Sequence, residues 1–230
     1  MKLIDEQLAY YRARAGEYDS DVHVADLIRT VKRRLRPQRR VEHALEMACG
    51  TGLWTPMVLS MAARVTLLDG SPEMLRIARA RVGAKRVRCV KANIFKWKPD
   101  QEYDLVFFAN WLSHVPPRQL LEFLRTVRSA VRPGGRVVIA EHDSRMAKYA
   151  DINPKQVRRT RRLHNGKKFA IVKVFYDLTF LRELLTALGF RVSIHKVGPV
   201  YFVLSAVRKS PRAPGNSAVG KLGSARRRKK

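Results

Sequence analysis

The chain has 230 residues, 46% of them apolar, which is enough for one globular α/β domain with a covered core and some additions. No apolar run is long enough to cross a bilayer, so we expect no membrane span, and the charged N-terminus lacks the pattern of a signal peptide. The net charge of +28 favours contact with polyanions, although solvated surface arginines would give the same value. Cys49 and Cys89 are too few for a disulfide framework or a paired metal site, so we predict no metal and a cytoplasmic location.

The first 36 residues are predicted to form an N-terminal helical cap. Apolar residues recur near helical spacing over 3–15 and again over 24–35, and Pro37 then breaks the pattern. We place the main domain at 37–207. Residues 208–230 are rich in Ser, Pro, Gly, Lys and Arg and poor in large apolar side chains, so they are predicted to form a disordered basic tail.

Strand-like and helix-like segments alternate through the main domain. The helix expected at 71–82 has Ser71 as its N-cap and Pro72 at its first position. This alternation is typical of a mostly parallel sheet with helices on both faces. In chain order, strands are expected at 41–47, 65–69, 86–90, 103–110 and 136–142, and helices at 55–63, 71–82 and 117–131.

Two hairpins interrupt this alternation. His164-Asn165-Gly166 joins two strand-like runs, so residues 157–175 are predicted to form an inserted β-hairpin. After a helix at 179–188, strands at 190–197 and 201–207 are expected to close the fold as an antiparallel pair. The predicted fold class is therefore α/β: a Rossmann-like, mostly parallel seven-stranded sheet with a terminal antiparallel hairpin, helices on both faces and an inserted β-hairpin.

The loop that follows the first strand carries the strongest functional signal. An apolar strand runs directly into a turn that contains Gly50 and Gly52, and a helix follows. Glycine allows positive φ and a close approach of backbone to ligand, and open α/β sheets bind ligands at the carboxyl ends of their strands. Thr55 occupies the place of the third glycine of a dinucleotide-binding loop, which weakens that alternative.

Together with the segments around it, this loop resembles the first motif of the class I S-adenosylmethionine-dependent methyltransferases. Glu46, Gly50 and Gly52 match the family pattern of an acidic residue, three residues and Gly-x-Gly. The resemblance implies that the loop backs the amino-acid part of the cofactor and that the acidic side chain reaches its ammonium group.

The next two strand ends extend the resemblance. Asp69 follows Gly52 by seventeen residues, and a carboxylate there can accept hydrogen bonds from both ribose hydroxyls. Met74 is placed against the adenine. Asn93 stands where the family usually has an aspartate, so the adenine contact depends on an amide instead of a charge.

Further matches lie at 10–19, 103–116 and 131–139, so the resemblance covers roughly residues 8–207. It implies S-adenosylmethionine as the cofactor, with a tyrosine of the entry segment capping it. The cofactor-binding residues implied in this way are Tyr11, Tyr18, Glu46, Ala48, Gly50, Gly52, Asp69, Gly70, Met74, Asn93, Ile94 and Asn110.

Methyl transfer from a sulfonium is an in-line displacement that depends mainly on positioning, and a base is needed only when the nucleophile must lose a proton. His114 follows the fourth strand and is the candidate base, because its ordinary pKa suits proton transfer near neutral pH. The alternative is that it caps the short helix or lines the pocket. Trp111, His142 and Tyr176 are predicted to contact the acceptor, and His142 is also a second candidate base.

The predicted hairpin suggests the charge of the acceptor. Its cations would suit an anionic acceptor such as a carboxylate; they are Arg158, Arg159, Arg161, Arg162, Lys167, Lys168 and Lys173. Solvated strand faces are the alternative explanation of the same residues.

Three functions remain open from the sequence. We favour transfer of a methyl group to an oxygen, nitrogen or carbon of a small molecule. An RNA methyltransferase is supported by the charge and the tail, but no RNA-binding module is recognisable. A non-catalytic cofactor-binding scaffold is the third, and the intact glycine loop argues against it. The sequence leaves the oligomeric state undefined.

Overall fold

The structure, a computed structural model, describes residues 2–20, 24–35, 40–149 and 157–210. The predicted basic tail therefore lies outside the described residues from 211 onward. Within the described ranges, no helix combines the length and the hydropathy needed to span a bilayer. The division into cap, main domain and tail stays a prediction.

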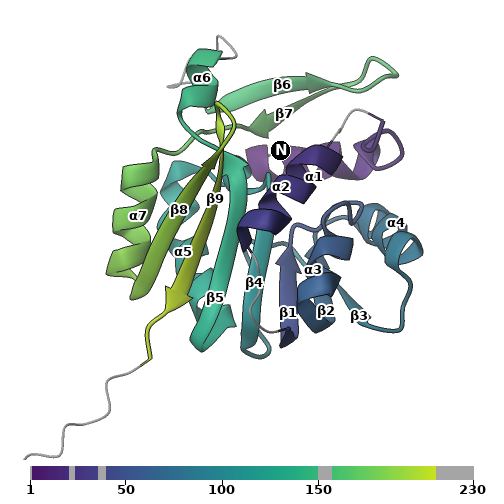
Figure 1. Ribbon diagram of the computed structural model, residues 1–230. Helices are drawn as coiled ribbons and strands as arrows, with labels where there is room; N and C mark the ends of the chain where they lie inside the picture. Colours follow the sequence, from purple (N-terminus) through teal and green to yellow (C-terminus); the bar gives the residue numbers. More distant parts are fainter. Residues whose placement is uncertain (1, 21–23, 36–39, 150–156, 211–230) are drawn as a thin grey trace, which may run out of the picture.

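A seven-stranded sheet forms the centre of the molecule, in the order β3-β2-β1-β4-β5-β9-β8 (Figure 1). The first five strands in this order pair in parallel, and β9 pairs antiparallel with both β5 and β8. This confirms the predicted Rossmann-like sheet with its terminal antiparallel pair. The strands are β1 (Val41–Met47), β2 (Ala62–Asp69), β3 (Val87–Lys91), β4 (Tyr103–Ala109), β5 (Val131–His142), β8 (Phe190–Val197) and β9 (Tyr201–Arg208).

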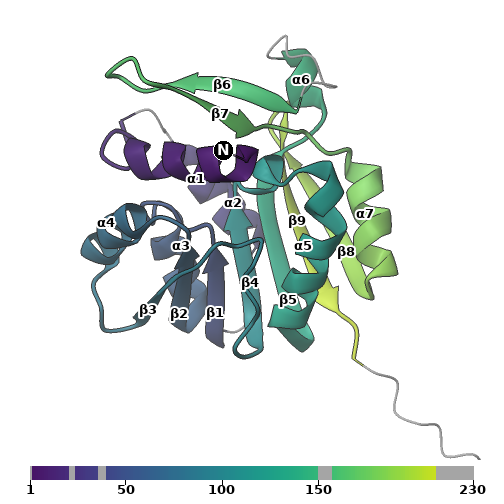
Figure 2. The same cartoon turned by 180° about the vertical axis from the view of Figure 1, so that it is seen from behind.

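Helices cover both faces of the sheet because buried strand residues alternate between two cores. Phe108 packs with α5 and α7 in one core, and Phe107 packs with α2, α3 and α4 in the other. Figure 2 shows α5 and α7 in front of the sheet in the view from behind. The helices are α1 (Leu3–Arg14), α2 (Ala25–Leu35), α3 (Thr55–Met61), α4 (Pro72–Val82), the 3₁₀ turn η1 (Leu112–His114), α5 (Pro117–Ala130), α6 (Arg145–Tyr149) and α7 (Leu178–Ala187).

The inserted hairpin forms a separate two-stranded sheet of β6 (Arg158–Arg162) and β7 (Lys168–Val172). Gly166 has φ +83°, the left-handed conformation expected at the last position of a three-residue hairpin loop, here residues 164–166 between Leu163 and Lys167. The hairpin lies beside α1, above the end of the main sheet that carries the β1 and β4 loops (Figures 1 and 2). A small apolar cluster joins the two elements through Tyr10, Leu163, Phe169 and Ile171.

Element boundaries differ from the sequence prediction in three places. Strand β5 begins at Val131 instead of 136, because Val131 already pairs with Tyr103 before a register shift in the ladder absorbs the Pro-Gly-Gly segment. Strand β2 begins at Ala62 instead of 65, at the expense of α3. Helix α6 was not predicted.

Candidate active site

The loop after β1 has the backbone conformation that its glycines predict. Gly50 and Gly52 have φ +55° and +79°, and Ala48 adopts φ +51° without being a glycine. Positive φ is costly for a residue with a Cβ, and such conformations cluster at binding sites. A Cβ on Gly52 would lie 3.0 Å from the Cβ of Ala78, so this glycine lets α4 pack closely against the loop.

Asp69, at the end of β2, holds this loop in place. Its Oδ2 accepts from Gly50 N (2.9 Å), and its Oδ1 accepts from Ser71 N (2.9 Å). Burial raises the pKa of the carboxyl group, whereas these backbone donors oppose that rise. Each carboxylate oxygen keeps a further lone pair, so Asp69 can still accept two hydrogen bonds from a pair of adjacent hydroxyls.

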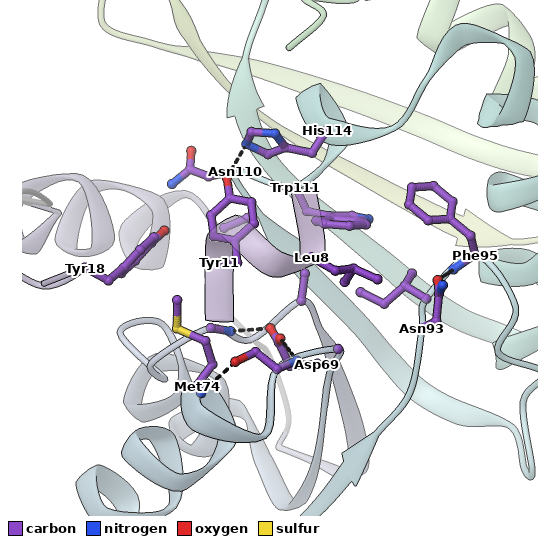
Figure 3. Close-up of a pocket in the computed structure, with 16 residues that line it drawn as sticks. Leu8, Tyr11, Tyr18, Asp69, Met74, Asn93, Phe95, Asn110, Trp111 and His114 are labelled. Atoms are coloured by element: carbon purple, nitrogen blue, oxygen red, sulfur yellow. Dashed lines mark hydrogen bonds between the residues drawn. The ribbon is translucent and has the colours of Figure 1, made fainter. Parts of the chain in front are cut away.

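A cavity opens at this edge of the sheet (Figure 3). It is bounded by the ends of β1, β2 and β4, by the segment after β3, and by α1. Its lining residues are Leu8, Tyr11, Tyr18, Ala48, Gly50, Asp69, Gly70, Ser71, Met74, Asn93, Ile94, Phe95, Ala109, Asn110, Trp111 and His114. Ten of the twelve residues that the resemblance implied for the cofactor line this cavity, whereas Glu46 and Gly52 do not.

Glu46 is buried next to the loop. Its Oε2 has no hydrogen-bond partner within the described parts of the chain, and desolvation raises the pKa of the carboxyl group to about 8. A cation near this carboxyl would favour its charged form. An orphaned buried acid beside a glycine loop fits an ammonium-bearing cofactor, with Asp69 available for its ribose.

Two asparagines line the same cavity at the ends of β3 and β4. Asn93 Oδ1 accepts from Phe95 N (3.0 Å), which fixes the local turn and leaves the amide nitrogen for a ligand. Asn110 has φ +53°, and its Oδ1 accepts from the hydroxyl of Tyr201 (3.0 Å). Ala48 and Asn110 thus both have positive φ, and both line the cavity at the ends of neighbouring strands.

Helix α1 and the segment after it close the cavity from above. We call helix α1 the lid. The Cδ2 of Leu8 lies 2.7 Å from the position that a Cβ would take on Gly70, so the lid packs directly against the loop after β2. Farther along, Thr51 Oγ1 donates to Asp19 Oδ1 (2.6 Å), and Arg81 forms an ion pair with the same carboxylate. The N-terminal segment is therefore tied to the glycine loop by specific side chains.

A second cavity of about 350 Å³ adjoins the first. Four residues line both: Tyr11, Tyr18, Asn110 and His114. Its volume is in the range of small-molecule sites. The other lining residues are Tyr10, Arg14, Val24, Leu27, His142, Arg161, Ile171 and Lys173.

His114 lies at the junction of the two cavities. Its Nδ1 is 2.7 Å from the carbonyl oxygen of Val172 and must donate to it, so its Nε2 accepts from the Tyr11 hydroxyl (2.9 Å; Figure 3). Desolvation, together with the charge of Lys173, lowers the pKa of His114 to about 3. His114 is therefore a weak base, and its Nε2, the nitrogen that could take up a proton, already accepts from Tyr11. To remove a proton from an acceptor, His114 would need Tyr11 to move away or to pass that proton on.

The three residues predicted to contact the acceptor lie in three different places in the structure. Trp111 lines the first cavity, with its ring 5.6 Å from that of Phe95, and His142 lines the second. Tyr176 lines neither cavity. It is buried, its hydroxyl donates to the carbonyl of Val115 (2.7 Å), and it packs in the main core. The contact between Tyr176 and the acceptor stays a prediction, and the structure shows that the polar atom of Tyr176 is used inside the fold.

Sequence reasoning missed several residues of the two cavities. Leu8, Ser71 and Phe95 line the first, and Arg14 lines the second. Glu141, a buried acid at the end of β5, contacts the acceptor side through Ser113. An acidic residue that ends the apolar run Val137–Ala140 was the available signal for Glu141; the others carry no motif.

Comparison with known proteins supports this interpretation of the site. Residues 44–135 match a family described as a methyltransferase domain. Two solved structures, a DhpI–SAM–HEP complex and a DhpI–SAH complex, are each 41% identical to the chain, with TM-scores of 0.79 and 0.78. The alignments cover 89% and 91% of this chain, and 97% and 98% of those chains.

More distant curated relatives match over shorter stretches. Malonyl-[acyl-carrier protein] O-methyltransferase of Paenibacillus sp. (strain JDR-2) is 30% identical over 57% of this chain and 52% of its own length. Trans-aconitate 2-methyltransferase of Shigella flexneri serotype 5b is 32% identical over 47% of this chain and 42% of its own length. The chain spans about half the length of the curated relatives it matches.

A parallel sheet with a glycine loop after its first strand and an acid at the end of its second defines a Rossmann-like protein that binds a ribose-containing cofactor. The extent of the match to the DhpI structures identifies the family. The chain belongs to the class I S-adenosylmethionine-dependent methyltransferases, and S-adenosylmethionine is its cofactor.

Proposed function

We propose that this methyltransferase acts on a small anionic molecule held in the second cavity. The observation that carries the proposal is the shared wall between the two cavities, formed by Tyr11, Tyr18, Asn110 and His114. The cofactor supplies an activated methyl group on a sulfonium. The chain then has to hold an acceptor atom in line with that group, and a neighbouring cavity of metabolite size serves this purpose.

The charge of the second cavity supports an anion. Arg14, Arg161 and Lys173 line it, and no acidic residue is among its lining residues. Arg14 lies over the rings of Tyr10 and Tyr18, with its guanidinium 5.7 Å and 5.0 Å from the ring centroids. Three cations around one small volume raise the local concentration of an anion and orient its charged group.

The names of two curated relatives agree with this charge. They are named for trans-aconitate and for a malonyl group, both of which are carboxylates. An ionised oxygen nucleophile has no proton to lose, so the reaction needs no general base. The weakly basic His114, bonded to the Tyr11 hydroxyl, then serves to orient that hydroxyl.

The test is methyl transfer from labelled S-adenosylmethionine to a panel of small acids, with trans-aconitate among them, each paired with its fully esterified or fully amidated, uncharged derivative. We expect turnover with at least one acid and at least a tenfold lower kcat/KM for its neutral partner. Equal turnover of the charged and neutral members would refute the anionic acceptor.

RNA is the second candidate acceptor, because the net charge of +28 attracts any polyanion. Binding to transfer RNA and ribosomal RNA across a salt series, with methyl incorporation as the readout, separates the two functions. Methylated RNA together with a steep salt dependence would replace the small-molecule proposal. Salt-sensitive binding without incorporation would leave the charge as a surface property.

A further inference from the structure

Three side chains from distant segments form a hydrogen-bonded chain beside the second cavity. Lys173, the residue after β7, donates from Nζ to Ser113 Oγ in η1 (2.8 Å). Ser113 Oγ in turn lies 3.0 Å from Glu141 Oε2 at the end of β5, and Ser113 N donates to the same oxygen (3.1 Å). Glu141 is only 2% exposed, so a buried carboxylate lies one hydroxyl away from an ammonium group in the acceptor cavity.

The polarity of this chain is fixed by the chemistry of its members. An ammonium can only donate, and a carboxylate can only accept. The single proton of Ser113 Oγ must therefore point to Glu141, and its lone pairs must face Lys173. Glu141 Oε1 accepts from His142 N (2.9 Å), so both carboxylate oxygens are engaged. Three hydrogen bonds hold the carboxylate in place, and Ser113 Oγ links it to the ammonium of Lys173.

The charges of Glu141 in β5 and Arg161 in β6 act on Lys173, and the charge of Lys173 acts on His114 in η1. The other charged or titratable residues that line the same cavity are Tyr10, Tyr11, Arg14, Tyr18 and His142. Burial lowers the pKa of Lys173, the charge of Glu141 raises it, and Arg161 lowers it further. Hydrogen bonds from His142, together with the charge of Lys173, hold the pKa of Glu141 down to about 2 against its own burial. Among these groups Glu141 is the negative charge that keeps Lys173 ionised.

The backbone around Lys173 has separate anchors. Lys173 N donates to the carbonyl of Val157 (2.9 Å), and Val174 N donates to the carbonyl of Ser113 (2.8 Å). The anchor at Val157 places the Cα of Lys173 without help from Glu141, whereas the anchor at Ser113 is itself held by Glu141 through Ser113 N. In addition, no carboxylate among the described residues forms a direct salt bridge with Lys173, so its ammonium can donate to a ligand.

We propose that Glu141 is a positioning residue for the methyl acceptor: through Ser113 it holds the Lys173 ammonium, charged and directed, at the wall of the second cavity, where the ammonium binds the anionic group of the acceptor. This inference rests on the proposed function. It assigns the direct contact with the anionic group to Lys173, one of the three cations that line the cavity, and gives Glu141 the role of holding that cation in place.

The test compares Glu141→Gln with the unchanged protein, both loaded with S-adenosylhomocysteine. Trans-aconitate, or whichever acid of the panel is methylated, is the probe, and its affinity is measured by calorimetry from pH 6 to 9. We expect at least a tenfold weaker affinity at pH 8 and a smaller loss at pH 6. The direction follows because removal of Glu141 lowers the pKa of Lys173, so the ammonium loses its proton as the pH rises.

Controls separate this role from a purely structural one. Glu122→Gln makes the same substitution on an exposed residue of α5 and should change nothing. Affinity for S-adenosylhomocysteine should stay within twofold of the unchanged protein in Glu141→Gln. In a Lys173→Met background, where the ammonium is already absent, Glu141→Gln should cost no further affinity for the acid.

The outcomes distinguish the two proposals. If the unchanged protein binds and methylates no acid, the proposed function fails. If it does bind an acid, but Glu141→Gln binds that acid equally well at every pH, or loses the same factor at every pH and for the neutral ester, the positioning role is overturned. Should Glu141→Gln not fold, Ser113→Ala breaks the same bridge with the carboxylate in place, and an unchanged acid affinity in that variant contradicts the proposal.

Discussion

The two halves of the site are built in different ways. The cofactor half consists of strand ends and tight loops, and its shape comes from backbone conformations at Ala48, Gly50 and Gly52. The acceptor half is made by α1 and the hairpin, which are held by side chains such as Gln7, whose Oε1 accepts from Val172 N and whose Nε2 donates to the carbonyl of His114. The first half depends on local geometry, whereas the second depends on contacts between segments far apart in the chain.

This difference separates what is common to the family from what is particular to this chain. A glycine loop with an acid at the next strand end serves any acceptor, because it holds the same cofactor. In the function we propose, the lid and hairpin determine which molecule can approach the methyl group. Substitutions in one half should therefore leave the binding function of the other half intact, and three experiments test this separation.

The largest effect is expected from Asp69→Ala in the cofactor half. It removes a buried carboxylate that accepts from Gly50 N and Ser71 N and is placed to bind the ribose. We expect affinity for S-adenosylhomocysteine to fall by ~1–3 kcal/mol, the usual cost of losing a charged hydrogen-bond pair. Calorimetry measures this loss, and Asp100→Ala, on an exposed carboxylate paired with Arg88, is the matched control. An unchanged affinity would remove Asp69 from the cofactor site.

The sequence predicted the cofactor half far better than the acceptor half. The mostly parallel sheet, the glycine loop and Asp69 follow from periodicity and short motifs, since each element is defined by neighbouring residues. The hairpin was also predicted, because Asn165-Gly166 specifies its turn locally.

The rest depended on packing that no local pattern encodes. The position of His114 between Val172 and Tyr11 joins segments 58 and 103 residues apart in the chain. A histidine in a loop suggests a base, and only the fold shows that burial lowers the pKa of this one to about 3 and that Tyr11 bonds to its Nε2. The placement of Tyr176 depends on packing in the same way, because its hydroxyl donates to the carbonyl of Val115 in the core.

An intermediate effect is expected where the halves touch, at Gly70. A Cβ on this residue would lie 2.7 Å from Leu8 Cδ2, so Gly70→Ala forces the lid helix or its leucine to move. We expect the free energy of unfolding to fall by about 1–2 kcal/mol, as for other overpacked contacts. Chemical denaturation measures it, and Gly16→Ala, whose added Cβ would meet nothing within 4 Å, is the control.

A second substitution sharpens this test. Leu8→Ala removes the atom that the methyl group added by Gly70→Ala would meet, so the two changes together should cost less than the sum of their separate effects. Strict additivity would show that lid and loop are not in contact in solution, and the two halves would then be more independent than the structure indicates.

The smallest effect is expected from Tyr11→Phe, which keeps the ring of the lid residue and removes its hydroxyl. The buried Nε2 of His114 then loses its donor, which should lower the free energy of unfolding by about 1 kcal/mol. Affinity for S-adenosylhomocysteine should change less than twofold, because the ring still lines the first cavity, whereas kcat for an acid acceptor should fall severalfold. Because the pKa of His114 is about 3, the histidine stays neutral at neutral pH, so this loss should be the same from pH 6 to 8. A loss of turnover that instead disappears as the pH rises would mean that His114 titrates in that range and works as a base once the hydroxyl no longer occupies its nitrogen.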